Sequence, residues 1–199
     1  MLRRNSSEIN TGSMADIAFL LLIFFLVTTT MEVDSGILRK IQQKPETQEK
    51  TIIKEKNILD VVINSKNELL VENKTININN LKQIAINFID NGAGLDKNKL
   101  PCDWCNGFKN PNSSDHPSKA FITIQTNSNT NYGVYIKVLN ELVAANTYLR
   151  NKLSKKKYRV SYNQLLDRFK IDKSKSLINK IENIKSKYPL LIADIENTN

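Results

Sequence analysis

The sequence is poor in the residue types on which most enzyme sites depend. Among its 199 residues there are one histidine, two cysteines and one tryptophan. It lacks a G-x-S-x-G nucleophile motif, a glycine-rich phosphate-binding loop and a recognisable pair of catalytic acids. We therefore predict that the chain is not an enzyme, and we expect neither a cofactor nor a metal ion.

Glycine and proline are scarce too, at six and five residues, whereas apolar residues make up an ordinary 40% of the chain. This composition argues against a disordered or fibrous protein. The formal net charge of +9 fits either an acidic partner, such as an anionic membrane face, or a solvated lysine-rich surface. Because no RNA- or DNA-binding motif accompanies the charge, we expect no nucleic-acid partner.

One segment near the start is mostly apolar. Residues 13–33 read S-M-A-D-I-A-F-L-L-L-I-F-F-L-V-T-T-T-M-E-V, and the run from Ile17 to Val27 has none at all. As a helix, residues 13–33 would be about 31 Å long, which matches the hydrocarbon thickness of a bilayer. We predict a transmembrane helix. A cleaved signal peptide is the less favoured alternative, because no A-x-A-like site follows the apolar run.

Asp16 stands where this apolar run begins. A carboxylate at mid-depth in a membrane costs about 2.5 to 3.5 kcal/mol in its charged form, so such a group is usually paired or protonated. Asp16 is therefore a candidate proton-transfer residue. At about 100° per residue, Ile23, Val27 and Thr30 share its stripe of the helix, and we predict that they line the proton path. The alternative is a helix-start acid that faces water.

The stretch from Glu8 to Thr30, E-I-N-T-G-S-M-A-D-I-A-F-L-L-L-I-F-F-L-V-T-T-T, resembles the membrane segment of the ExbD/TolR family of inner-membrane energy transducers. In that family the single membrane acid carries the proton, and the match places this role on Asp16. The family often has Thr-Pro ahead of the acid, where this sequence has Thr11-Gly12-Ser13. The resemblance implies a transducer subunit that uses the proton motive force to power TonB-dependent outer-membrane transport or envelope integrity.

The resemblance also implies partners and a location. These are an ExbB/TolQ-like polytopic membrane protein, a TonB/TolA-like rod and a second copy of the chain, which would form a homodimer within the complex. The chain would cross the bacterial inner (plasma) membrane once, with a cytoplasmic N-terminus and a periplasmic C-terminal domain. The basic residues that flank the helix mildly favour the opposite orientation, but a long C-terminal part can translocate regardless of its charge.

The fold class expected is a single N-terminal transmembrane helix plus a small α+β, sandwich-like periplasmic domain with extra C-terminal helices. The predicted segments are a cytoplasmic lead-in at 1–12, the membrane helix at 13–33, a periplasmic linker at 34–50, the α+β domain at 51–160 with an inserted cysteine loop at 92–119, and a C-terminal helical extension at 161–199.

Hydrophobic patterns and turn residues place the elements of that domain. We predict strands at 58–63, at 69–71 with Thr75 and Ile76, and at 120–126. A helix with Leu81, Ile84, Ala85 and Phe88 on one face would be capped by Asn79 or Asn80, and a long helix would begin near Tyr132. Two further helices would follow, one capped by Ser161 and one that stops before Pro189.

The cysteine loop carries the remaining candidate chemistry. Cys102-Asp103-Trp104-Cys105 is a C-x-x-C motif that fits a local disulfide in an oxidising compartment, a redox pair, a metal site or free thiols. A metal site would need two more ligands, and only His116 stands nearby. We interpret His116 as a loop residue rather than a metal ligand. The alternative function is accordingly a membrane-tethered periplasmic binding module with a structural or redox C-x-x-C loop.

Overall fold

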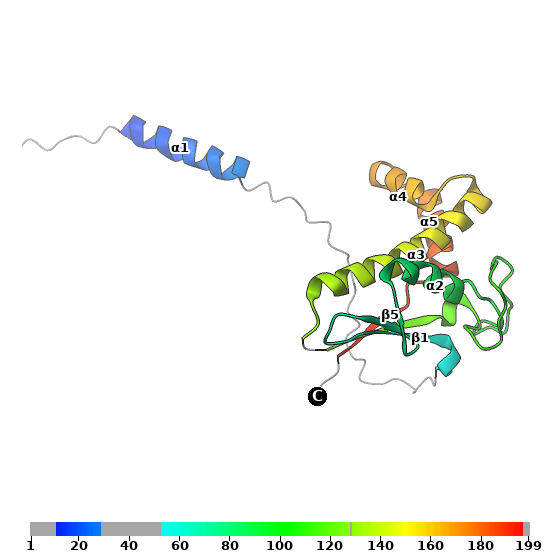
Figure 1. Ribbon diagram of the computed structural model, residues 1–199. Helices are drawn as coiled ribbons and strands as arrows, with labels where there is room; N and C mark the ends of the chain where they lie inside the picture. Colours follow the sequence, from blue (N-terminus) through cyan, green and yellow to red (C-terminus); the bar gives the residue numbers. More distant parts are fainter. Residues whose placement is uncertain (1–10, 29–52, 128, 197–199) are drawn as a thin grey trace, which may run out of the picture. The chain divides into compact units, whose positions relative to one another are not determined.

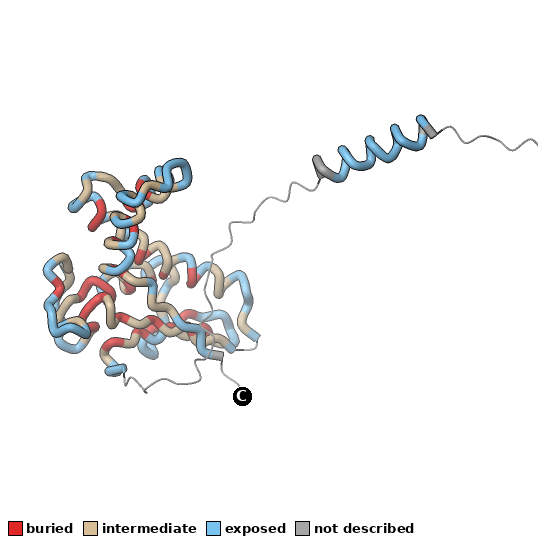
Figure 2. Tube along the Cα trace, turned by 180° about the vertical axis from the view of Figure 1, so that it is seen from behind, coloured by how far each residue is buried: buried red, intermediate tan, exposed pale blue. Residues whose placement is uncertain are grey.

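The computed structural model describes residues 11–28, 53–127 and 129–196, and the chain divides into two compact units, 1–49 and 50–199. In the first unit the described residues form one helix, α1 (Thr11–Thr28). Its large apolar side chains are between 42% and 63% exposed on every side of the helix, and Figure 2 colours the described residues of this helix as exposed. They are Met14, Ile17, Phe19, Leu20, Leu21, Leu22, Ile23, Phe24 and Phe25.

Helix α1 covers 13–28 of the predicted membrane segment, and residues 29–33 lie outside the described residues. Residues 1–10 of the lead-in predicted at 1–12 and the linker at 34–50 lie outside them as well, whereas residues 11 and 12 of that lead-in are the first of α1. Within the described part of the chain, no helix combines the length and the apolarity needed to cross a membrane. The 21-residue transmembrane helix therefore stays a prediction.

The second unit is a mixed α/β domain built on a five-stranded sheet of order β3-β2-β1-β4-β5. Strands β1 (Ile58–Ile63), β2 (Leu69–Val71) and β3 (Lys74–Ile76) form an antiparallel meander. Strand β4 (Phe121–Thr126) runs parallel to β1, and β5 (Ile192–Glu196) runs parallel to β4. The β2–β3 turn needs two residues with positive φ, which Glu72 and Asn73 supply at 48° and 64°.

Helices α2 (Ile78–Ile89) and α3 (Tyr132–Tyr158) lie on one face of this sheet (Figure 1). The core lies between the two layers, where fully buried side chains such as Ile124 and Leu142 meet. The cap predicted at Asn79 or Asn80 is wrong, because Asn77 has the extended backbone of a cap and its side chain accepts from the Asn79 N–H at 2.9 Å. Helix α3 begins at Tyr132, as predicted, with Asn131 as its cap.

The C-terminal part contains the two predicted helices and one strand that the sequence analysis missed. Helix α4 (Tyr162–Ile171) begins at a capping box in which Ser161 and Gln164 bond reciprocally. Helix α5 (Lys175–Lys187) packs against α4 and α3. The chain then returns to the sheet as the edge strand β5, so the expectation of helices alone after residue 161 is wrong. An edge strand is held by backbone bonds, and its side chains carry only a weak pattern.

Candidate functional site

Asp16 lies in the second turn of α1, is exposed, and is the only ionisable side chain of that helix. Ile23 follows seven residues later, which is nearly two full turns, so it shares the Asp16 stripe. The side chain of Val27 and all of Thr30 lie outside what the structure describes. The described residues therefore place two of the four predicted proton-path residues on one face of the helix, and the role of all four stays a prediction.

In the second unit the cysteine loop is closed by a disulfide between Cys102 and Cys105, with their Cα atoms 5.5 Å apart. Gly92, where the loop leaves α2, has φ of 64°, a left-handed conformation that L side chains rarely adopt. A Cβ at this position would lie 2.7 Å from the Cys105 Cβ. Glycine is thus required at the start of the loop for both its backbone conformation and the close approach of the disulfide.

Asn91 anchors the loop to the end of α2. Its buried Nδ2 donates to the Asn110 carbonyl at 2.9 Å and to the Ser114 carbonyl at 2.7 Å, and its Oδ1 accepts from the Asn110 N–H at 2.9 Å. Next to it, the Gly107 N–H donates to the Asp90 carbonyl at 3.0 Å. One side chain therefore fixes two separate points of a loop that has little secondary structure of its own.

A second anchor joins the loop to the segment before β1. The Asp115 carboxylate lies 2.5 Å from the Lys56 ammonium and accepts from the Asn57 Nδ2 at 3.2 Å, and the Asp115 N–H donates back to the Asn57 Oδ1 at 2.7 Å. Burial by itself would raise the pKa of Asp115, but the hydrogen bonds from Lys56 and Asn57 and the nearby lysine charges outweigh it, so its pKa is lowered.

His116 follows Asp115 and is buried, with 3% of its surface exposed. Its Nδ1 accepts from the Ser118 N–H at 3.1 Å, which caps a short 3-10 turn, and its ring meets Trp104 edge-on at 5.3 Å between centroids. Burial lowers the pKa of His116. The structure describes no group of three or more His, Cys, Asp or Glu side chains that could hold a metal ion. The contacts with Ser118 and Trp104 make His116 a capping and packing residue.

The C-terminal extension packs against the cysteine loop and α3. The Lys187 ammonium lies 3.5 Å from the centroid of the Trp104 ring, and the Tyr188 hydroxyl donates to the Asp90 carboxylate. Arg150 on α3 donates to the Tyr188 carbonyl at 2.9 Å. Burial raises the pKa of Asp90, although its hydrogen bonds oppose this. The inserted loop and the extension thus form one continuous structure.

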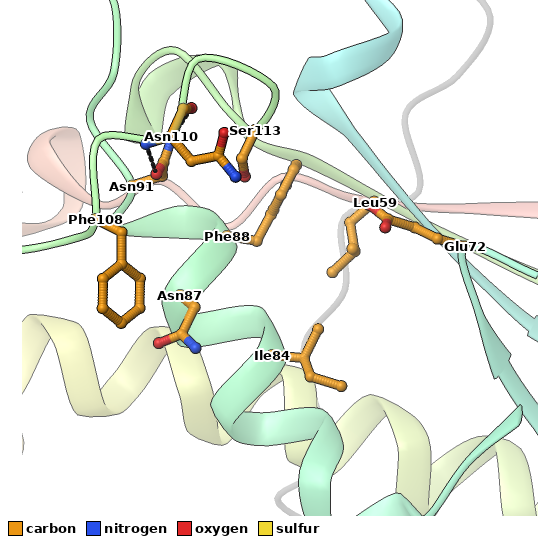
Figure 3. Close-up of a pocket in the computed structure, with 9 residues that line it drawn as sticks. All are labelled: Leu59, Glu72, Ile84, Asn87, Phe88, Asn91, Phe108, Asn110 and Ser113. Carbon is orange, nitrogen blue, oxygen red and sulfur yellow. Dashed lines mark hydrogen bonds between the residues drawn. The ribbon is translucent and has the colours of Figure 1, made fainter. Parts of the chain in front are cut away.

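Two pockets border this structure. The first has a volume of about 320 Å³ and lies between α2, β1 and the loop, where Phe88 and Ile84 form its apolar side and Asn91 and Asn110 bond to each other (Figure 3). Its polar lining combines the amide groups of three asparagines with the Glu72 carboxylate and the Ser113 hydroxyl, beside apolar surface. Its lining residues are Leu59, Glu72, Ile84, Asn87, Phe88, Asn91, Phe108, Asn110 and Ser113.

The second pocket, of about 380 Å³, opens between the C-terminal ends of α3 and α5 and the disulfide segment. Three lysines distinguish it from the first pocket. Its lining residues are Asp103, Trp104, Leu153, Lys156, Lys157, Asn183 and Lys187. The sequence analysis singled out the cysteines and His116 but not Asn91, Asp115 or Lys187, because no motif marks residues whose partners are distant along the chain.

Comparison with protein-family models gives one further finding. Residues 3–157 match the family described as Biopolymer transport protein ExbD/TolR, which is more than half of the chain. The match includes α1 and the elements from β1 to nearly the end of α3, and it stops before α4, α5 and β5. A search of curated proteins finds none that matches the chain.

Proposed function

The chain belongs to the ExbD/TolR family of biopolymer transport proteins, and on that basis we propose that it is the proton-motive-force-driven transducer subunit of an inner-membrane complex. Proteins of this family are transport accessory proteins rather than enzymes, and they typically work with ExbB/TolQ-type and TonB/TolA-type partners. The proposed partners of this chain are an ExbB/TolQ-like polytopic protein, a second copy of the chain, and a TonB/TolA-like rod.

The observation that carries the proposal is the position of Asp16 on α1. This residue is the only ionisable side chain in a helix whose described apolar side chains point in every direction. A helix that is apolar all round is stable when buried among other helices or in lipid. A carboxylate on such a helix is costly unless it is paired or protonated, and intramembrane acids of this kind often form proton relays.

The described helix has 18 residues, which corresponds to about 27 Å. The full predicted segment, 13–33, would reach about 31 Å and match the hydrocarbon thickness. We therefore place the membrane span at 13–33, with the N-terminus in the cytoplasm and the second unit in the periplasm. The proposed orientation follows the family, since the basic residues beside the helix do not favour it.

In the proposed mechanism, Asp16 binds a proton inside a bundle formed by the ExbB/TolQ-like partner. Binding removes the energetic penalty of the charge and release restores it, so the preferred position of the helix changes at each step. Ile23, Val27 and Thr30 line the path. The linker at 34–50 passes the movement to the periplasmic unit, which acts on the rod and through it on outer-membrane transport or envelope integrity.

The decisive experiment replaces Asp16 with asparagine, which keeps the shape of the side chain but cannot titrate. Asp16→Asn should insert and co-purify with the polytopic partner as the wild type does, while energy-dependent uptake or envelope integrity falls to the level of a strain without the gene. Asp34→Asn is the matched control, because it removes an acid just beyond the predicted membrane segment, and it should leave activity unchanged.

Two outcomes would refute the transducer proposal. Full activity of Asp16→Asn would show that α1 is only an anchor, and equal loss in Asp34→Asn would show that any charge change near the helix is harmful. If Asp16→Asn were silent while the double variant Cys102→Ser/Cys105→Ser lost activity, the membrane-tethered binding module would be the better description.

A further inference from the structure

The positive charge of the chain is concentrated in one region of the second unit. Residues 150–187, which end α3 and form α4 and α5, contain 13 lysines and arginines but only three acids. Their net charge of +10 accounts for the whole excess of the chain, whose total is +9. The remainder is close to neutral, so the charge is a local feature that calls for a local explanation.

Within this region the second pocket gathers three lysines from two helices. Lys187 is held against the Trp104 ring at 3.5 Å, and the Lys157 ammonium donates to the Asn183 Oδ1 at 2.7 Å. Lys156 completes the set. In the described part of the chain none of these three lysines forms an ion pair. Their charges therefore repel one another, and no direct ion pair within the described residues offsets them.

Helix electrostatics explains part of this arrangement. Lysines are favoured in the last turn of a helix, and these three lie at the ends of α3 and α5. Each helix end contributes about half a negative charge, and Asp103 adds one more at the rim. The three lysine charges exceed these roughly two negative charges, so the pocket keeps an excess of about one positive charge. A bound anion would offset that excess.

We propose that this pocket binds a phosphate group. Lysine binds phosphate as a point charge, and the lining offers three lysines but no arginine fork for bidentate binding. The face of Trp104 that could stack on a sugar or a base is occupied by Lys187. The phosphate belongs either to a soluble phosphate ester or to the headgroup of an anionic phospholipid, and both sources share the chemistry that the lysines recognise.

Trp104 provides a direct readout, because it is the only tryptophan of the chain and lines the pocket. Full-length chain in an uncharged detergent is titrated with inorganic phosphate, and the fluorescence of Trp104 is recorded. We expect a saturable change that sodium chloride at matched ionic strength does not reproduce. Equilibrium dialysis with radiolabelled phosphate measures the same binding independently of the fluorophore.

The pocket variant is Lys156→Gln/Lys157→Gln/Lys187→Gln, and the matched control is Lys173→Gln/Lys175→Gln/Lys185→Gln. Both remove three positive charges, but the control lysines are exposed and lie outside the pocket. The pocket variant should bind phosphate at least about tenfold more weakly, while the control stays within about twofold of the wild type. Equal loss in both variants, or no saturable binding of wild-type chain in dialysis, would overturn the proposal.

The source of the phosphate is decided in a second arm. The chain is placed in nanodiscs of phosphatidylcholine or of phosphatidylglycerol, and the phosphate titration is repeated. If the natural ligand is a lipid headgroup, phosphatidylglycerol produces the Trp104 change and inorganic phosphate adds nothing further. If it is a soluble ester, both discs give the same titration. A Trp104 change in phosphatidylglycerol discs that persists in the pocket variant would contradict specific binding.

Discussion

Replacing Asn91 with alanine should destabilise the cysteine loop more than any other single polar change at the end of α2. Asn91 is 2% exposed, and its side chain makes three hydrogen bonds to the backbone of Asn110 and Ser114. Asn87, one turn earlier on the same helix, is exposed, and its side chain accepts one hydrogen bond, from the exposed Gln83 side chain. The same substitution at Asn87 is therefore a matched control.

The size of the effect follows from what each lost bond leaves behind. Ser114 is fully buried, so its carbonyl would lose a partner that water cannot easily replace, which costs about 1 to 3 kcal/mol. Asn110 is exposed, and water can replace its two lost bonds at about 0.5 kcal/mol each. Asn91→Ala should thus lower the free energy of unfolding by about 2 to 4 kcal/mol. Asn87→Ala should change it by less than about 0.5 kcal/mol, since alanine favours helix.

The assay is urea unfolding of the full chain, followed by Trp104 fluorescence and by far-ultraviolet circular dichroism. Trp104 reports the loop and circular dichroism reports the helices and sheet. If the two transitions coincide in wild type and separate in Asn91→Ala, the loop opens locally when its anchor is lost. A loss below about 1 kcal/mol, or equal losses in Asn91→Ala and Asn87→Ala, would refute the assignment of Asn91 as the anchor.

Two other perturbations test the same loop. Because burial lowers the pKa of His116 below 6.5, the neutral ring contributes stability that is fully present above about pH 6.5 and is lost as the pH falls through the folded-state pKa. The free energy of unfolding, measured between pH 8 and pH 4, should fall with falling pH for this reason. The variant His116→Asn, which retains an acceptor for the Ser118 N–H, should lose this contribution to the pH dependence. An identical pH dependence in the variant would contradict the assignment. Reduction of the Cys102–Cys105 disulfide, which closes a very short ring, should lower the free energy of unfolding by about 2 kcal/mol, and the Cys102→Ser/Cys105→Ser variant should be insensitive to reductant. A wild-type midpoint that does not move with dithiothreitol would show that the bridge adds no stability.

The family match ends inside the second folded unit. The match ends at residue 157, just before the end of α3, and the elements beyond it are α4, α5 and β5. The part beyond the match also contains Lys187, the last residue of α5, and Tyr188, which follows it; they contact Trp104 and Asp90 respectively. The C-terminal extension is thus part of the folded unit, and removing it would expose the buried side of the cysteine loop.

Several elements could be predicted from local patterns. Strand β1 and helices α2 and α3 carry the period-2 and period-3.6 hydrophobic patterns that determine which face is buried, and α3 begins at the predicted residue. The cap at Ser161 could be predicted for the same reason, since a cap depends on residues within one turn; the reciprocal bond from Gln164 is a finding of the structure. The cap of α2 was placed two or three residues late because three asparagines within four residues, Asn77, Asn79 and Asn80, are similar cap candidates.

The sequence by itself determined the family, the apolar helix with its single acid, and most of the sheet and helix layers, because each depends on residue types at short, regular spacing. Only the tertiary structure decided the rest. Tyr188 reaches Asp90 across 98 residues, and Asp115 reaches Asn57 across 58. Strand β5 is paired through its backbone. Such contacts leave no local pattern, since a buried polar group needs one partner of matching geometry, which the folded chain can bring from any distance along the sequence.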